Sequence, residues 1–354
     1  MIKGAIKALA PVAAIPLLAV AAPATANVEM PVDAYQSNIA KAKTLMVQNP
    51  TAALDLARGA RHFIEGETMP ELKDRLIANW LEGEALMRLN RPDEAAKVIR
   101  PALVEAEKSW SGDKVYADLL RSAASLEGRA GNSDDALDYF LRAQERYEKL
   151  GDTRSQAIVL QNIGSLYSRA GDFEQVLKYY RKAAEVFTDD AILSLSAHNN
   201  IGNALRGLGR YAEAEAEFIR ALEIARKMKS PILEARILTN LASALHLQGD
   251  GDEAETIAVK ALGLAKEHAE GWKPFVYGVL AQIELGRGNI DKADDYISLT
   301  FADQRIEATT TLFRDFHGAA AKIFAEKGKS DLAAKHSAAL DRLESQTKKI
   351  KNES

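Results

Sequence analysis

The sequence predicts an all-α protein, an α-solenoid built from about seven to eight helical hairpins. Two observations support this prediction. Apolar residues recur at helical spacing through most of the 354 residues, and no stretch shows the alternation of a strand. A small residue also returns about every 40 positions within the same local pattern, and such a period is typical of stacked repeats. These small residues are Gly83, Ala124, Gly164, Gly202, Ala242, Ala281 and Ala321.

Each repeat has the pattern of two helices joined by a glycine turn. The first helix has an apolar stripe beside the small residue, which lets a second helix approach closely. Glycine then accepts the left-handed backbone that ends the helix, as we expect at Gly171, Gly209 and Gly249. Because one hairpin has too little apolar surface to fold alone, it must stack on its neighbours. The second helices of the three clearest repeats contain Val176, Tyr180 and Ala183, then Ala214, Phe218 and Ala221, then Ala254, Ala258 and Ala261.

Taken in order, the chain divides into four segments. We interpret them as a signal peptide (1–26), degenerate hairpins (27–110), a regular solenoid (111–342) and a polar C-terminal tail (343–354). In the degenerate part we expect helices over 33–48, 51–65, 72–89 and 92–109. Pro101 should kink or split the last of these helices, because proline lacks a donor and clashes with the preceding turn.

The first 26 residues have the three parts of an export signal. Lys3 and Lys7 make a basic start, residues 8–22 contain no charge, and Ala24–Thr25–Ala26 forms an A-x-A cleavage site. The uncharged run is shorter than the ~20 residues that a membrane-spanning helix needs. We therefore expect cleavage after Ala26, a periplasmic or secreted location, and no membrane span after signal cleavage.

Composition and motifs narrow the classes of function. The chain has 46 basic residues, 50 acidic residues and no cysteine, so it offers no basic face for nucleic acid and no thiolate or cysteine metal site. Gly328–Lys329–Ser330 lacks the upstream glycine of a phosphate-binding loop. The six histidines include no i, i+4 pair for zinc, and His198 and His317 fall at stripe positions, where we expect them to pack. We therefore expect no enzyme, no cofactor and no metal site.

The repeats resemble the tetratricopeptide repeat. The resemblance rests on the turns Gly171–Asp172–Phe173, Gly209–Arg210–Tyr211 with Ala214, and Gly249–Asp250, and it covers about 115–342 well and 33–110 loosely. The period departs from the common ~34 residues. It is similar to the longer-helix subclass of kinesin light chains, Pins-type polarity adaptors and bacterial peptide-sensing regulators. The resemblance implies a right-handed superhelix that binds a protein or peptide in a concave groove lined by the first helix of each hairpin.

The resemblance also implies a set of groove-facing positions: Gln161, Asn162, Ser165, Asn199, Asn200, Asn203, Arg206, Arg236, Thr239, Asn240, Ser243 and His246. Among these, Asn162, Asn200 and Asn240 occupy the same place in three consecutive repeats. In the family, such an asparagine often hydrogen-bonds the backbone of an extended ligand. The alternative is that it packs neighbouring first helices together, and either role would explain a poor helix former in mid-helix.

Two further groups of residues leave alternatives open. The arginines either face the channel, where they would suit carboxylates, or lie on a solvated face. They are Arg121, Arg129, Arg169, Arg206 and Arg236. A late apolar cluster with Tyr296, Phe301, Phe313 and Phe316 is either the cap that closes the solenoid or an exposed docking patch.

The main functional hypothesis is a non-enzymatic, exported scaffold that binds a protein or peptide ligand in its groove, with self-association as a further option. The alternative is a detached sensor or regulatory module. The order of signal peptide and long-period repeats resembles the periplasmic sensor half of bacterial diguanylate cyclases, in which a membrane helix and a GGDEF domain follow. Neither follows in this sequence, so we expect such a module to signal through a separate membrane protein.

Overall fold

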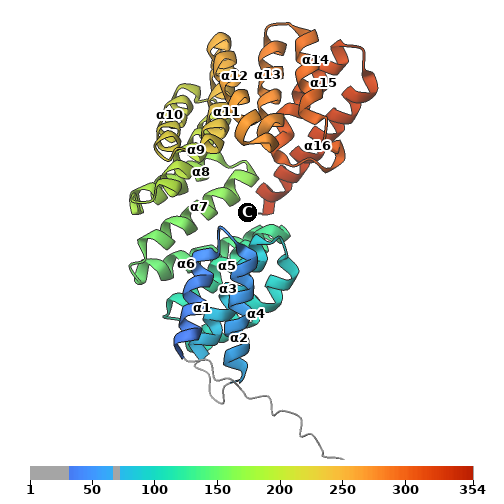
Figure 1. Cartoon of the computed structure of the whole chain (residues 1–354). Helices are drawn as coiled ribbons and strands as arrows, with labels where there is room; N and C mark the ends of the chain where they lie inside the picture. The colour runs from blue at the N-terminus through green and yellow to red at the C-terminus, as the bar shows by residue number, and fades with distance from the viewer. Residues whose placement is uncertain (1–31, 67–71, 354) are drawn as a thin grey trace, which may run out of the picture.

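Eight antiparallel helical hairpins stack along the chain in the computed structural model, which describes residues 32–66 and 72–353 (Figure 1). The first four hairpins are α1 (Val32–Leu45) with α2 (Pro50–Gly66), α3 (Leu72–Arg88) with α4 (Pro92–Ser109), α5 (Lys114–Ala130) with α6 (Ser133–Lys149), and α7 (Thr153–Ala170) with α8 (Phe173–Val186). The last four are α9 (Ala191–Gly207) with α10 (Tyr211–Lys227), α11 (Pro231–Gln248) with α12 (Gly251–His268), α13 (Lys273–Gly286) with α14 (Ile290–Phe301), and α15 (Arg314–Glu326) with α16 (Ser330–Glu353). The expected all-α solenoid is therefore confirmed, while the expected signal peptide lies outside the described residues.

The odd-numbered helices form the inner layer of the stack. Each of α7, α9, α11 and α13 packs against the odd-numbered helix of the next hairpin, and the even-numbered helices α2–α14 show no comparable packing with one another. In a curved stack the layer whose helices approach each other most closely lies on the concave side. The first helix of each hairpin therefore lines the concave side, as the repeat pattern implied. Three short 3-10 helices lie in the connections late in the chain: η1 (Glu270–Trp272), η2 (Ile306–Ala308) and η3 (Thr311–Phe313).

A large side chain of the second helix fills the space beside the small residue of the first helix. A Cβ placed on Gly202 would lie 2.7 Å from Cε1 of Phe218, and a Cβ placed on Gly164 would lie 2.6 Å from Cδ2 of Tyr180. Carbon atoms of different side chains do not approach that closely, so these hairpins require glycine. In both hairpins the large residue follows the small one by sixteen positions.

In the sixth hairpin the same spacing pairs two alanines. Ala258 follows Ala242 by sixteen positions, and both are fully buried. Because Ala258 is small, a methyl group on Ala242 can be accommodated there. The third hairpin instead combines Ala124 with the large Phe140, both buried, so a large residue in the second helix does not require glycine in every hairpin.

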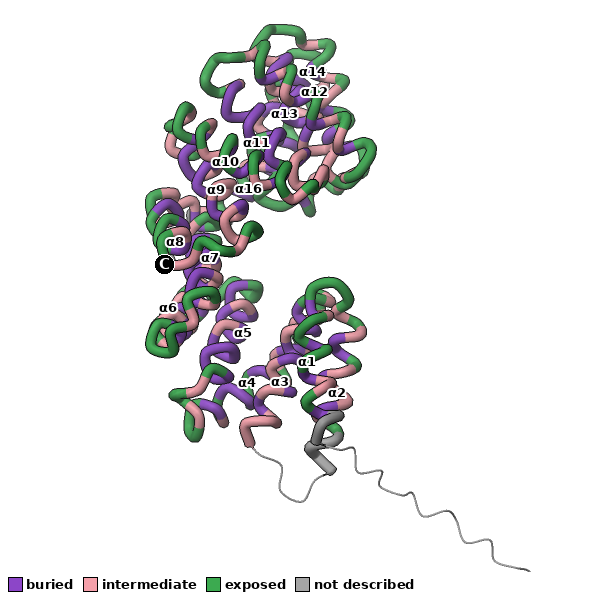
Figure 2. The backbone as a smooth tube through the Cα atoms, turned by 60° about the vertical axis from the view of Figure 1, so that its left-hand side comes forward, coloured by how far each residue is buried: buried purple, intermediate pink, exposed green. Residues whose placement is uncertain are grey.

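The apolar core is divided into two large clusters that meet at the fourth hairpin. Val159, Ile163 and Leu166 of α7 belong to the cluster with α1–α6, whereas Leu177 and Tyr180 of α8 belong to the cluster that continues to the last hairpin. Figure 2 shows the buried residues following the facing sides of successive helices in both halves. Stacking has therefore extended the core along the chain without thickening it.

The last helix corrects the expected chain ending. We expected the solenoid to stop at 342 and a polar tail to follow, but α16 continues to Glu353 and reaches α6 and α7 (Figure 1). Leu343 is fully buried, and no glycine or proline occurs after Gly328 to end the helix. The expected split at Pro101 is also wrong, because α4 runs without a break from Pro92 to Ser109 with Pro101 on its exposed face.

The late apolar cluster packs where the seventh and eighth hairpins meet. Phe301, Phe313 and Phe316 are all buried and Tyr296 is half-buried, so these side chains belong to the core and do not form an exposed docking patch. His317 lies in the same core, as we expected, and its Nδ1 is 2.8 Å from Nδ1 of His336. These two imidazoles join α15 to α16.

The pairing of Gly202 with Phe218 predicts opposite effects for two glycine-to-alanine substitutions. Gly202→Ala should lower the free energy of unfolding by about 1–3 kcal/mol, because the new methyl group overlaps the Phe218 ring. Gly263→Ala is the matched control in α12, where nothing lies within 4 Å, and it should gain about 0.5–1 kcal/mol. Urea unfolding of both variants measures the difference. Shifts of the same sign would contradict this packing scheme.

The buried histidine pair predicts a loss of stability in weak acid. Burial lowers the pKa of both His317 and His336 from 6.5 to about 4, with smaller contributions from Arg342 on His317 and from His317 on His336. Between pH 6.5 and about 4 the unfolded chain therefore binds protons that the folded chain does not, and the free energy of unfolding falls as the pH falls. The loss should be roughly 3 kcal/mol for each imidazole that stays neutral.

Urea unfolding at a series of pH values tests this prediction. The double variant His317→Gln/His336→Gln should flatten the dependence in this window, while His268→Gln, on the exposed end of α12, should leave it unchanged. An identical pH profile for the double variant and the unmodified chain would contradict the assignment.

Candidate binding channel

The twelve expected groove residues lie on α7, α9 and α11, three first helices that pack in sequence (Figure 1). Their exposure differs widely. Ser165 and Arg236 are exposed, whereas Gln161, Thr239 and Ser243 are buried. The other seven are half-buried, which is the exposure expected of side chains that line a channel: Asn162, Asn199, Asn200, Asn203, Arg206, Asn240 and His246.

Two of the buried members are bound to neighbouring helices. The amide of Gln161 donates a 2.8 Å hydrogen bond to the carbonyl of Leu193 and so joins α7 to α9. The Thr239 hydroxyl donates to the carbonyl of Ala235 at 2.7 Å and accepts from the indole N–H of Trp272 at 3.0 Å. Their polar groups therefore hold the wall together.

The three asparagines in register have three different environments. Asn240 donates a 2.8 Å hydrogen bond to Oδ1 of Asn199, across α11 and α9. Asn200 donates to the carbonyl of Ser196 within α9 at 2.8 Å. The side chain of Asn162 makes no hydrogen bond with any described residue. Asn240 thus joins two helices, Asn200 is bonded within its own helix, and Asn162 has its donors and acceptor available.

Arg206 and Arg236 lie on the wall of the channel but differ in their partners. Arg206 donates to Oγ of Ser243 at 3.1 Å, and its Nη1 lies 3.5 Å from a carboxylate oxygen of Asp315 on α15. Arg206 of α9 therefore contacts α11 through Ser243 and the start of α15 through Asp315. Arg236 stacks over the ring of Trp272, 4.9 Å from its centroid, in a cation–π contact.

The other arginines that we considered are held by the protein itself. Arg121 lies 3.6 Å from Glu84 in a buried cluster between α3 and α5. Arg169 donates to the carbonyl of Gly128 at 2.8 Å, and Arg129 donates to an asparagine of the preceding hairpin at 3.4 Å. These three therefore connect neighbouring hairpins.

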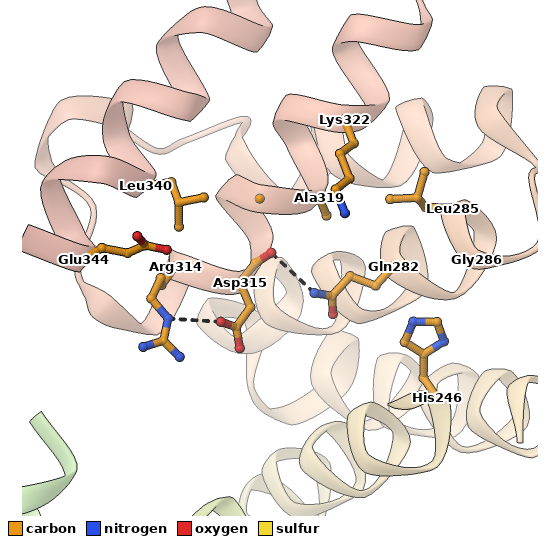
Figure 3. Close-up of a pocket in the computed structure, with 11 residues that line it drawn as sticks. His246, Gln282, Leu285, Gly286, Arg314, Asp315, Ala319, Lys322, Leu340 and Glu344 are labelled. Atoms are coloured by element: carbon orange, nitrogen blue, oxygen red, sulfur yellow. Dashed lines mark hydrogen bonds and ion pairs between the residues drawn. The ribbon is translucent and has the colours of Figure 1, made fainter. Parts of the chain in front are cut away.

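A pocket of about 610 Å³ opens at the C-terminal end of this wall (Figure 3). It lies between α11, α13, α15 and α16. Its apolar lining comes from Leu285, Ala319 and Leu340, together with two glycines. Its polar lining consists of His246, Gln282, Arg314, Asp315, Lys322 and Glu344. The volume is that of a small-ligand site, and the lining is divided between apolar and polar residues.

His246 is the one expected groove residue in this pocket. Burial lowers the pKa of His246 below its ordinary value, and the nearby charge of Arg287 lowers it further. The imidazole is therefore neutral at neutral pH and offers one donor and one acceptor.

Sequence reasoning missed the pocket residues beyond His246, although a signal for two of them was present. Ser165, Asn203 and Ser243 each directly follow the small residue of their repeat, and so do Gln282 and Lys322. Extending this register to the last two repeats would have identified both. Glu344 had no such signal, because it belongs to the segment expected to be a tail.

Helix α16 borders the channel along much of its length. Leu340 and Glu344 line the pocket beside α13 and α15. Further along, Thr347 lies against the turn between α7 and α8, where a Cβ on Gly171 would be 3.3 Å from its methyl carbon. The last helix thus runs from the final hairpin back to the fourth.

The described residues contain neither a metal-binding cluster nor a membrane-spanning helix. Within 32–66 and 72–353, no three side chains of the His, Asp or Glu type gather closely enough to hold a metal ion. In the same part of the chain, no helix combines the length and hydrophobicity required to span a bilayer.

Comparison with known families identifies two tetratricopeptide repeat segments, at residues 115–189 and 193–267. They coincide with α5–α8 and α9–α12, so the central hairpins, including the three helices of the candidate channel, carry this repeat. No curated protein matches the sequence.

Several solved structures have a similar fold at low sequence identity. A Rap protein complexed with competence and sporulation factor has a TM-score of 0.62 at 15% identity, over 90% of this chain and 99% of that one. The apo form of the quorum sensor NprR from B. thuringiensis has a TM-score of 0.65 at 16% identity, over 87% of each chain. Aspartyl phosphate phosphatase F from Bacillus subtilis has a TM-score of 0.54 at 16% identity, over 89% of this chain and 95% of that one. At such identities the likeness concerns the fold alone.

The different environments of the asparagines predict different costs on stability. Asn240→Ala removes the hydrogen bond between helices and leaves Oδ1 of Asn199 without its donor, so it should lower the free energy of unfolding by roughly 1 kcal/mol. Asn162→Ala removes no bond and should change it by less than about 0.5 kcal/mol. Chemical denaturation measures the free energy of unfolding of both variants. Equal decreases would contradict this prediction and would indicate that the asparagine has the same packing role in each repeat.

Proposed function

We propose that this protein is a non-enzymatic, exported scaffold that binds a protein or peptide segment in the channel bordered by its first helices and α16. The observation that supports this most directly is the set of half-buried amides without partners. Neither Asn162 nor Asn203 forms a side-chain hydrogen bond with a described residue, and both lie on the channel wall. An amide side chain offers two donors and an acceptor, the groups that a peptide backbone needs.

The position of α16 supports a polypeptide as the ligand. Helix α16 lies beside the wall of first helices at two places: Glu344 lines the pocket with residues of α11, α13 and α15, and Thr347 lies against the turn at Gly171. A surface that accommodates one segment of polypeptide in this way suits another. The ligand would share the channel with α16 and contact both.

The proposed location rests on the first 26 residues, which have the parts of a cleavable export signal. Removal of this segment would leave a mature chain that begins at Asn27. The proposed partner is therefore a protein or peptide found outside the cytoplasm.

A second candidate function is a detached sensor that signals through a separate membrane protein. The fold likeness to NprR, which is described as a quorum sensor, favours this alternative. Scaffold and sensor share the same channel and differ in the partner, so the identity of the partner separates them.

Site-specific photo-crosslinking in living cells tests the proposal. A photoreactive amino acid in place of Asn203 should capture a defined partner from the periplasm, whereas the same group in place of Lys182, exposed on the second helix α8, should not. Substituting Asn162, Asn200 and Asn240 together by alanine removes the unbonded amide of Asn162 and the side-chain oxygens of Asn200 and Asn240, which accept no hydrogen bond from a described residue. Each hydrogen bond that the ligand makes to these groups is worth about 1 kcal/mol, so capture should fall sharply.

Two controls accompany this experiment. Thermal melting must show that the triple variant remains folded. Mass spectrometry of this protein, recovered from the periplasm with its crosslinked partner, must place its own N-terminus at Asn27. Undiminished capture by a folded triple variant would refute the channel as the binding surface. An intact Met1 in the membrane fraction would refute export.

A further inference from the structure

The pocket at the end of the channel has an unusual distribution of charge. Its four charged residues are two cations and two anions, so its lining is neutral overall while His246 is neutral. Arg314 and Asp315 are paired, with Nε and a carboxylate oxygen 3.1 Å apart. Lys322 and Glu344 are not paired with each other or with any other described residue.

Lys322 and Glu344 come from different helices and line the same pocket. Figure 3 shows Lys322 on α15 and Glu344 on α16 at separate edges of the pocket, with the apolar side chains of Ala319 and Leu340 nearby. Both side chains are exposed to solvent, and neither forms an ion pair with a described residue, so each is available to a charged group of a ligand that enters the pocket.

The space between them suits a small molecule larger than an ion. A volume of about 610 Å³ lies within the range of pockets that enclose drug-sized ligands. The matching ligand has one negative and one positive group, no net charge, and an apolar body between them.

We propose that this pocket binds a short peptide with both ends free, its carboxylate on Lys322 and its ammonium group on Glu344. This inference goes beyond the proposed function, because the pocket lies at the end of the channel and its lining includes none of the three asparagines in register. Because Glu344 belongs to α16, a bound peptide ties α16 to α15. Binding should therefore slow amide hydrogen exchange in α16.

Isothermal titration calorimetry on the full chain with alanyl-leucyl-alanine as the probe tests the proposal. The free tripeptide should bind. Its N-acetylated form should bind roughly tenfold more weakly to the unmodified chain, and so should its C-terminal amide, because each loses one charge-assisted hydrogen bond.

Two variants then assign each end of the peptide to its residue. In Glu344→Gln the acetylated and free forms should bind equally, while amidation still weakens binding. In Lys322→Gln the amide and free forms should bind equally, while acetylation still weakens binding. Lys182→Gln and Glu185→Gln, exposed on α8, should change neither comparison.

Three results would overturn the proposal: no binding of the free tripeptide at millimolar concentration, equal binding of free and blocked forms to the unmodified chain, or the same pattern in both variants. Free leucine that binds as tightly as the tripeptide would overturn the assignment to a peptide in favour of an amino acid. The alanine triple variant at Asn162, Asn200 and Asn240 should bind the tripeptide normally. Tripeptide binding by this variant therefore tests the pocket independently of partner capture, which tests the channel.

Discussion

Contact between the second helix and a small residue of the first helix determines how closely the two helices of a hairpin pack. Phe218 against Gly202 and Tyr180 against Gly164 bring the two helices together at close range. Because this contact recurs at a fixed spacing within each repeat, successive hairpins present similar faces and stack in the same way. The close approach of the first helices to one another, and so the channel that they line, follows from that regularity.

The channel depends equally on the end of the chain. Helix α16 starts in the last hairpin, lines the pocket through Glu344, and reaches the turn at Gly171 in the fourth hairpin. That hairpin is also where the two halves of the apolar core meet. The last helix therefore touches the solenoid at the junction of its two cores, and the buried pair His317 and His336 fixes its other end.

The repeat pattern in the sequence was sufficient to predict the fold, because local spacing determines stacking. It was less informative about the site. The register of Asn162, Asn200 and Asn240 was visible, but only the structure shows that Asn240 is bonded to a neighbouring helix while Asn162 is not. The position of Glu344 was not predictable, because it depends on the contact of α16 with helices far away in the sequence. Nothing in the local pattern near residue 344 indicates that contact.

The central claim is that a ligand occupies the channel between the first helices and α16, and a removable crosslink tests it most directly. The chain has no cysteine, so Gly171→Cys with Thr347→Cys introduces one pair at a site of close contact. Oxidation should form a bond within one chain. Because the ligand contacts α16 in its docked position, fixing α16 there should raise partner capture by a photoreactive group at position 203 above its level in the reduced protein. Equal or lower capture in the oxidised state would contradict the account.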